Sequence, residues 1–419
     1  MIEAVALSTL TTIRVGGPPA ARVAPVTEQD LINETLSVWG MDENWLLLGG
    51  GSNIVVADEG FDGVVIQVVT RGIEVLEDED EDEAGRDDTD TDTDTETETD
   101  TETETDTDSD TDDRTATVAP SGARVRLRVQ AGEPWDHLVA YAVQHGWSGI
   151  EALSGIPGLC GAAPVQNIGA YGQELSDSLV AIDFLSYETG EVGRLERADL
   201  GLGYRTSVLK QGLLGVVLAI ELELHDTRAE ASVLGSALGQ PLKYAQLAGA
   251  LGAQLGDRVA LQLVRSTVLG LRAEKGMVLD PNDPDTFSAG SFFTNPIVTE
   301  SFSRSLPADA PRWPLEPEPA DRVIPLEEYM GVGPIPGDEP VRLVKLSAAW
   351  LIEHSGVSRG FHLPGSQAAV SSKHTLALTN TGGATAAEVA ELARYVLGRV
   401  QAEFGVNLQP EPVLVGLTL

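Results

Sequence analysis

Apolar and polar positions along the chain predict both strands and helices. Residues 124–129 read Arg-Val-Arg-Leu-Arg-Val, and this alternation is typical of a half-buried strand. Residues 45–48, 64–69 and 215–224 are apolar runs that predict further strands. The first of these runs leads directly into three glycines.

Two helices are indicated by start signals followed by apolar residues at helical spacing. Thr27 is a predicted N-cap for a helix that contains Leu31 and Ile32. Thr385 and Glu388 fit a capping box. The helix that follows the capping box has an apolar face of Val389, Leu392, Ala393, Val396 and Val400.

Two more helices are predicted in the middle of the chain. Pro134 opens the first, whose apolar face is Trp135, Leu138, Val139, Ala142 and Val143. Asp257 is expected to cap the second, which Lys275-Gly276 closes and whose apolar face is Ala260, Leu263, Val264, Val268 and Leu271. Strands and helices mix without regular alternation along the chain, so we expect the α+β class.

Net charge is concentrated in one tract. The chain has 65 acidic and 27 basic residues, which gives a formal charge of −38. Residues 77–113 hold 22 acids and one arginine. This tract lacks the apolar side chains whose burial would offset the entropy lost on ordering. It therefore predicts a disordered acidic insertion between two strands, at 64–69 and 124–129. An interaction segment or a device for salt adaptation is the alternative interpretation.

Composition excludes several functions. The negative charge argues against a nucleic-acid-binding surface and against docking on an anionic membrane. No stretch is long and apolar enough for membrane insertion, and residues 1–4 lack the features of a signal peptide, so a cytoplasmic location is expected. Cys160 is the one cysteine, and the six histidines show no ligand spacing, so no metal site is predicted.

Two glycine-rich segments are candidates for ligand binding. In residues 48–54, Leu-Gly-Gly-Gly-Ser-Asn-Ile, consecutive glycines after a strand let backbone amides approach phosphate oxygens, although a tight turn is the alternative. The pattern is neither a dinucleotide fingerprint nor a Walker loop. Residues 155–172 are also dense in glycine and small residues. Such a segment suits main-chain contact with a large flat ligand, with an irregular structural loop as the alternative.

Six segments together resemble a known family. GGGSN, SGIPGLCGAAPVQNIGAYG, GYRTS, SAGSFFTNP, KLSAAWLIE and LQPEP occur in one order. Their conjunction is similar to the UDP-N-acetylenolpyruvoylglucosamine reductases (UDP-N-acetylmuramate dehydrogenases), from about Thr9 to Gly416 without the acidic tract. The resemblance implies an FAD-binding module of the vanillyl-alcohol oxidase (PCMH) type in two subdomains, 1–70 with 405–419 and 71–268, plus a separate α+β substrate-binding domain at 278–404.

The resemblance also implies a reaction. An enzyme of this family uses NADPH and bound FAD to reduce UDP-N-acetylglucosamine enolpyruvate to UDP-N-acetylmuramate in peptidoglycan precursor synthesis, with hydride from flavin N5. A cytoplasmic monomer that acts on this small molecule, without nucleic acid, is therefore expected. The residues matching the family's FAD cradle are Gly49, Gly50, Gly51, Ser52, Asn53, Gly155, Ile156, Pro157, Gly158, Gly161, Ala162, Ala163, Gln166, Asn167, Gly169, Ala170 and Tyr171.

Three positions match the family's catalytic residues. Arg205 suits a carboxylate that gains negative charge, because a guanidinium is planar and always charged. Ser291 matches the proton donor to carbon, and Glu411 could donate a hydrogen bond if burial keeps it protonated. Tyr244, Lys275 and Asn295 match residues that hold the substrate.

Two other functions stay open at this level. Another FAD-dependent oxidoreductase of the same module, acting on a small alcohol or sugar, explains the glycine loops but not the three catalytic matches together. A non-catalytic protein that recruits a basic partner through the acidic tract explains only residues 77–113.

Overall fold

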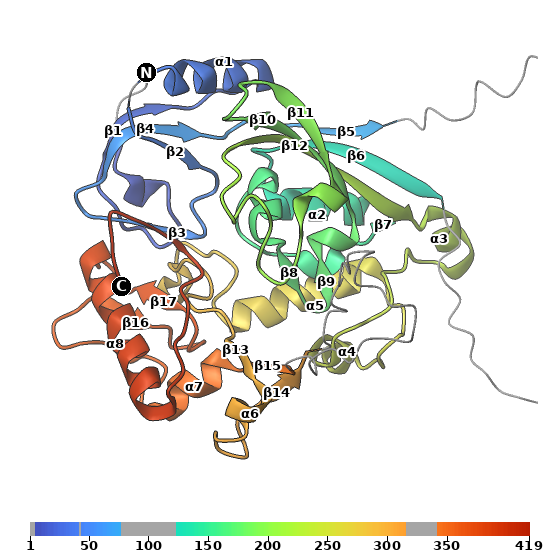
Figure 1. Ribbon diagram of the computed structural model, residues 1–419. Helices are drawn as coiled ribbons and strands as arrows, with labels where there is room; N and C mark the ends of the chain where they lie inside the picture. The colour runs from blue at the N-terminus through green and yellow to red at the C-terminus, as the bar shows by residue number, and fades with distance from the viewer. Residues whose placement is uncertain (1–4, 42, 77–122, 316–341) are drawn as a thin grey trace, which may run out of the picture.

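The computed structural model describes residues 5–41, 43–76, 123–315 and 342–419 (Figure 1). The acidic tract at 77–113, predicted to be disordered, lies outside these residues. Helices and strands mix throughout the described ranges, as the α+β prediction requires.

The N-terminal part forms a small parallel sheet with strand order β1-β4-β2. Its strands are β1 (Pro19–Val23), β2 (Trp45–Leu48) and β4 (Phe61–Gln67). Helix α1 (Glu28–Trp39) connects the first two, and the Thr27 hydroxyl accepts a hydrogen bond from the Asp30 amide at 3.1 Å, which confirms the predicted cap. Strand β3 (Ile54–Val56) pairs in parallel with β18 (Val413–Val415), so the end of the chain returns to this part.

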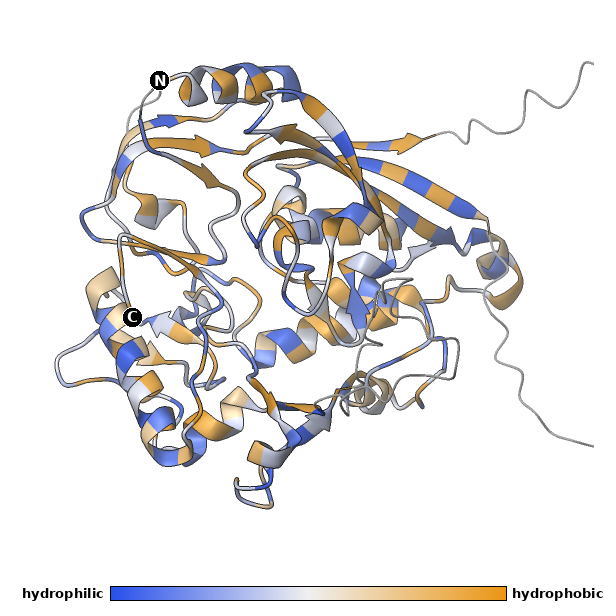
Figure 2. Ribbon diagram, viewed as in Figure 1, coloured by the Kyte–Doolittle hydropathy of each residue, from blue (hydrophilic) through white to orange (hydrophobic). Residues whose placement is uncertain are grey.

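A six-stranded antiparallel sheet forms the second part, with order β11-β10-β12-β6-β5 and β7 beside β12. Its strands are β5 (Ile73–Leu76), β6 (Arg124–Gln130), β7 (Trp147–Ser148), β10 (Leu179–Ser186), β11 (Val192–Glu196) and β12 (Gly215–Asp226). Figure 2 shows the alternation of hydrophilic and hydrophobic residues along β6 that predicted a half-buried strand.

Strand β5 is a correction to the sequence prediction, which placed the last strand before the acidic tract at 64–69. The additional strand Ile73–Leu76 is short and pairs antiparallel with β6, with Leu76 opposite Arg126. Residues 77–122 therefore join two neighbouring strands of one sheet.

Helix α2 (Trp135–Gln144) packs against this sheet with all five predicted apolar residues buried. Helix α5 (Leu261–Glu274) begins later than predicted, with Ala260 as N-cap. The prediction that Asp257 caps it was wrong, because the Asp257 carboxylate instead accepts a hydrogen bond from the Gln254 amide at 2.8 Å. Leu263, predicted on the apolar face, is 49% exposed.

Four short elements accompany the six-stranded sheet and α5. They are β8 (Gly169–Ala170), β9 (Gln173–Glu174), α3 (Arg228–Leu234) and α4 (Ala245–Leu251). The turn between β8 and β9 contains Gly172, whose φ is +86°. The polypeptide can therefore reverse direction tightly beside the sheet.

The C-terminal part has its own core around α8 (Ala386–Phe404), whose predicted capping box and buried face are confirmed. The other elements are β13 (Ile297–Thr299), α6 (Glu300–Ser303), β14 (Arg312–Pro314), β15 (Leu343–Leu346), α7 (Ala348–His354), β16 (Ala368–Val370) and β17 (Leu378–Asn380). Ile13, Val15 and Val55 contribute to this core from the N-terminal part. The domain boundaries given above stay a prediction.

Membrane-spanning helices and clusters of metal-binding side chains are absent from the described ranges. No helix in them has the length and apolar character needed to cross a bilayer. No three histidine, cysteine, aspartate or glutamate side chains gather there in an arrangement that could hold a metal ion.

Candidate active site

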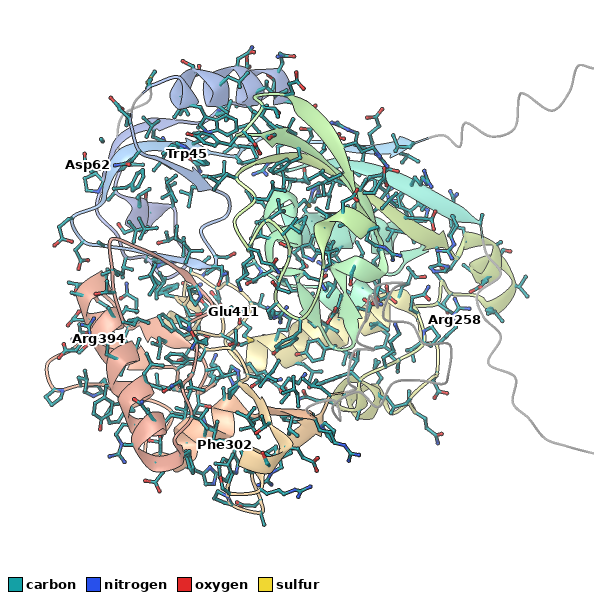
Figure 3. All side chains as sticks on the ribbon, in the orientation of Figure 1. Trp45, Asp62, Arg258, Phe302, Arg394 and Glu411 are labelled. Carbon is teal, nitrogen blue, oxygen red and sulfur yellow. The ribbon has the colours of Figure 1, made fainter. Side chains whose placement is uncertain are left out.

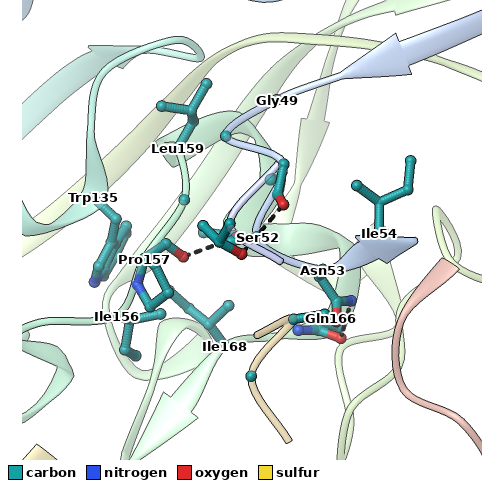
Figure 4. Close-up of a pocket in the computed structure, with 18 of the residues that line it drawn as sticks. Gly49, Ser52, Asn53, Ile54, Trp135, Ile156, Pro157, Leu159, Gln166 and Ile168 are labelled. Atoms are coloured by element: carbon teal, nitrogen blue, oxygen red, sulfur yellow. Dashed lines mark hydrogen bonds between the residues drawn. The ribbon is translucent and has the colours of Figure 1, made fainter. Parts of the chain in front are cut away.

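The glycine turn after β2 packs backbone to backbone against the second glycine-rich segment. A Cβ on Gly50 would lie 2.8 Å from the Gly158 Cα, and one on Gly51, whose φ is +63°, would lie 2.0 Å from the Leu10 carbonyl oxygen. The Ser52 hydroxyl donates to the Pro157 carbonyl at 3.1 Å (Figure 4). Only glycine permits this approach, so main-chain atoms line the space between the two loops.

The second segment continues as a 3-10 helix, Cys160–Gln166, on top of the six-stranded sheet. Gly161 donates its amide to the Ala131 carbonyl at 2.8 Å, and a Cβ on Gly161 would meet Ala131 Cβ at 2.5 Å. The Asn53 side chain joins the segments, donating to Gln166 Oε1 at 3.2 Å and to the Glu411 carbonyl at 3.3 Å (Figure 4). One asparagine thus links the glycine turn, the second loop and the C-terminal segment.

These loops border a cavity of about 390 Å³. Thirteen of the predicted cofactor residues line it: Gly49, Gly50, Gly51, Ser52, Asn53, Ile156, Pro157, Gly158, Gly161, Ala162, Ala163, Gln166 and Gly169. The other four, Gly155, Asn167, Ala170 and Tyr171, are not among its lining residues. Asn167 instead links the loop to the residues that follow it. Its side chain donates to Glu174 Oε2 at 2.9 Å and accepts from the Ser176 amide at 3.0 Å.

All three residues that match the family's catalytic positions line the same cavity. Arg205 has a left-handed backbone with φ of +53° and donates from its guanidinium to the Gly169 carbonyl at 3.0 Å. Its Nε lies 3.6 Å from Glu411 Oε1. In the view of Figure 3, Glu411 lies between the C-terminal part and the part that contains the six-stranded sheet.

Ser291 and Glu411 are held together by backbone pairing. The Glu411 amide donates to the Phe292 carbonyl at 2.9 Å, and the Thr294 amide donates to the Gln409 carbonyl at 3.0 Å. Thr12 ties this pair to the glycine turn, because its amide donates to the Gly51 carbonyl and its hydroxyl to the Ser288 carbonyl, the latter at 2.6 Å. Ser291 is therefore fixed relative to both Glu411 and the turn.

Burial sets the protonation of Glu411. Its side chain is 11% exposed, and burial raises the pKa of its carboxyl while the charges of Arg205 and Lys210 oppose that rise. The pKa of Glu411 lies above the usual glutamate value as the net result. Burial in the cavity thus favours the protonated form of this carboxyl more than an exposed position would.

The residues predicted to hold the substrate lie outside the cavity lining in two groups. Tyr244 packs edge-to-face on Tyr171 with ring centroids 5.7 Å apart, and Lys275 Nζ lies 5.7 Å from the Tyr171 centroid. Lys275 also donates to Gln246 Oε1 at 3.2 Å. In the second group, Asn295 Oδ1 accepts from the Ala348 amide at 3.0 Å.

Arg272 is a cavity residue that sequence reasoning missed. Its guanidinium donates to the Met277 carbonyl at 3.1 Å, while its buried Nε makes no hydrogen bond within the described part of the chain. Burial lowers the pKa of Arg272, against the opposing effects of Tyr171 and Asp136. The sequence does offer a signal for Arg272, because it lies one helical turn before Lys275, which was already a candidate site residue. The residues at the cavity thus combine a glycine cradle with a half-buried cation, which fits a cofactor that carries phosphates.

Comparison with known proteins defines the class first. Residues 113–196 match the family model of an FAD-binding domain, and residues 282–415 match that of the UDP-N-acetylenolpyruvoylglucosamine reductase C-terminal domain. The chain is an FAD-dependent oxidoreductase, and the predicted α+β class is confirmed.

Relatives along the whole chain then define the family. The chain is 53% identical to the UDP-N-acetylenolpyruvoylglucosamine reductase of Leifsonia xyli subsp. xyli, covering 100% of both chains. It is 42% identical to that of Saccharopolyspora erythraea, covering 99% of this chain and 95% of the relative. The crystal structure of the corresponding reductase from Thermus caldophilus matches with a TM-score of 0.56 at 22% identity, covering 99% of each chain. The chain belongs to the UDP-N-acetylenolpyruvoylglucosamine reductase family, which confirms the resemblance.

Proposed function

We propose that the chain uses NADPH to reduce UDP-N-acetylglucosamine enolpyruvate to UDP-N-acetylmuramate in peptidoglycan precursor synthesis. The observation that carries this proposal is the meeting of Arg205, Ser291 and Glu411 at one cavity beside the glycine turn. Three distant segments of the chain supply these side chains, and each type of group is one that the reduction requires.

The cofactor would be held largely by main chain. Residues 49–53, 156–159 and 161–163 line the cavity, so their backbone groups could bind the cofactor, and Arg272 offers a cation to an anionic group. When bound there, FAD supplies the hydride that reduces the substrate's carbon–carbon double bond.

Arg205 and Glu411 would stabilise the negative charge that the reduction places on the substrate. Hydride addition to the terminal carbon leaves charge on the neighbouring carbon and its carboxylate. The Arg205 guanidinium is permanently charged and fixed by the Gly169 carbonyl, so it needs no reorganisation as that charge develops. The Glu411 carboxyl, if it retains its proton, donates a hydrogen bond to the same group.

Ser291 would deliver the proton to carbon. A hydroxyl is a weak acid in water, but an oriented carbanion is a strong base, so transfer is feasible when the two are held together. The backbone pairing of Phe292 with Glu411 holds Ser291 in position. Lys275 would pair with the diphosphate of the substrate, and Tyr244 and Asn295 would help to hold the substrate.

The test separates two half-reactions of the purified holoenzyme. The protein is expected to be yellow, to lose its flavin absorbance when NADPH is added without oxygen, and to regain it when the enolpyruvyl sugar nucleotide follows. Ser291→Ala should keep the first step and lose the second, whereas Ser305→Ala, at an exposed serine outside the cavity, should keep both.

Other outcomes identify the alternatives. Oxygen consumption with a small alcohol or sugar, with no response to the enolpyruvyl substrate, would show a different FAD-dependent oxidoreductase. Full activity of Ser291→Ala would disprove the proposed role of that serine.

A further inference from the structure

A single carboxylate outside the cavity joins three elements that shape it. Asp136 lies in the first turn of α2, where the helix dipole favours a negative charge. Its Oδ1 accepts from the Gly155 amide at 2.6 Å and from Arg265 Nη1 at 2.6 Å, and its Oδ2 accepts from Arg265 Nη2 at 2.9 Å. The carboxylate thus connects α2, the start of the second cofactor loop and α5.

The loop also packs directly on α5 at this point. Gly155 has φ of +71°, and a Cβ there would lie 2.8 Å from Leu269 Cδ2 and 3.5 Å from Arg272 Nε. The absence of a side chain lets the loop backbone contact the guanidinium that lines the cavity. A shift of Gly155 away from α5 would therefore open the space beside Arg272.

Arg265 and Arg272 are seven residues apart on α5, so they project from the same face of the helix. Asp136 pairs with Arg265 and lies close enough to Arg272 for its charge to oppose the lowering of the Arg272 pKa by burial. Fixing Arg265 also fixes the rotation of α5 about its axis, and that rotation determines where the Arg272 guanidinium lies.

We propose that Asp136 is a positioning residue for the cofactor, because its carboxylate holds the Gly155 end of the loop and helix α5 in the arrangement that presents Arg272 to the cavity. The proposal rests on FAD binding and not on the identity of the sugar-nucleotide substrate. It can therefore stand even where the proposed reaction fails.

The matched control is a second carboxylate–arginine pair away from the cavity. Asp183 on β10 pairs with Arg128 on β6 at 2.7 Å, and both side chains are 26% exposed. Neither residue lines the cavity. Arg128 also pairs with Glu28 at 2.8 Å, so loss of Asp183 removes one of its two carboxylate partners and should lower stability without changing cofactor release.

The experiment measures the rate of FAD release from purified holoenzyme by the rise in flavin fluorescence, together with the unfolding midpoint. Asp136→Ala is expected to release FAD about tenfold faster, the equivalent of one lost charge-assisted hydrogen bond. Asp183→Ala should release FAD at the wild-type rate. Release from Asp136→Ala that is no faster than from Asp183→Ala overturns the proposal.

Two further variants keep the test decisive if Asp136→Ala does not fold. Asp136→Asn keeps an oxygen for the Gly155 amide but loses the charge that pairs with Arg265, and Arg265→Lys keeps the charge but loses the two-pronged contact. Each should accelerate release by an intermediate factor, and the double variant should be no worse than the more severe single variant because both act through one contact. Wild-type release rates in both single variants would refute the proposal.

Discussion

Arg205 Nε faces Glu411 Oε1 at 3.6 Å, which places a permanent cation beside a carboxyl with a raised pKa. Burial is the larger influence on Glu411, so the neighbouring guanidinium does not bring its pKa back to the ordinary value. The cavity therefore places a guanidinium beside a carboxyl whose protonated form is favoured more than that of an exposed glutamate. In the proposed reaction, both groups would stabilise a substrate carboxylate that gains negative charge.

The first prediction concerns the pH dependence of substrate reduction. If the reaction needs protonated Glu411, the rate of flavin reoxidation by the enolpyruvyl substrate should fall as pH rises through the raised pKa of Glu411. Glu411→Gln has no proton to lose, so it should be slower but should lack this fall. Stopped-flow absorbance between pH 5 and 9 measures both profiles, and an unchanged fall in the variant would assign it to another group.

A second prediction concerns stability. The pKa of Glu411 is raised in the folded state, whereas in the unfolded chain it should be near the ordinary value of about 4.3. Wild-type stability should therefore decline as pH rises between these two values, because the unfolded state ionises first. Glu411→Gln should unfold at a progressively higher temperature than wild type as pH rises through this window.

The control for that comparison is an exposed glutamate on α8. Glu391→Gln should shift the unfolding midpoint by the same small amount at pH 5 and at pH 8. If the difference in unfolding midpoint between Glu411→Gln and wild type is also the same at pH 5 and at pH 8, burial does not raise the pKa of this carboxyl.

Local patterns predicted the elements that depend on neighbouring residues. The capping box at Thr385 and the apolar face of α2 match the structure, because both reflect contacts within a few residues. The prediction that Asp257 caps α5 was wrong because its carboxylate accepts a hydrogen bond from the Gln254 amide instead. Strand β5 was too short to show a period of its own.

Long-range contacts were beyond the reach of pattern alone. The glycine density predicted close backbone approach, but not that Gly50 would face Gly158. Asp136 and Arg265 resemble ordinary surface charges in the sequence, and only the fold brings them to Gly155. The catalytic matches came from family resemblance, since nothing in their spacing predicts that they converge.

A third prediction tests the geometry of Arg205. Arg205→Lys keeps the charge but cannot reproduce the contact with the Gly169 carbonyl while facing Glu411. Flavin reoxidation by the enolpyruvyl substrate should slow by about 100-fold or more, while flavin reduction by NADPH stays within a small factor. Arg197→Lys, which changes an exposed arginine bonded to the Ser176 carbonyl, should leave both steps unchanged.

The last prediction contrasts two glycine substitutions. In Gly50→Ala the new Cβ would lie 2.8 Å from the Gly158 Cα, so one of the two cofactor loops must move. We expect a loss of about 1–3 kcal/mol in the free energy of unfolding and weaker FAD retention on gel filtration.

Gly398 is the matched control. It is exposed within α8, and nothing lies within 4 Å of a Cβ built on it. Gly398→Ala should therefore raise stability by about 0.5–1 kcal/mol through helix propensity and leave FAD content unchanged, both measurable by denaturant unfolding and flavin absorbance. Full FAD retention by Gly50→Ala would mean that the contact between the loops does not shape the cofactor site.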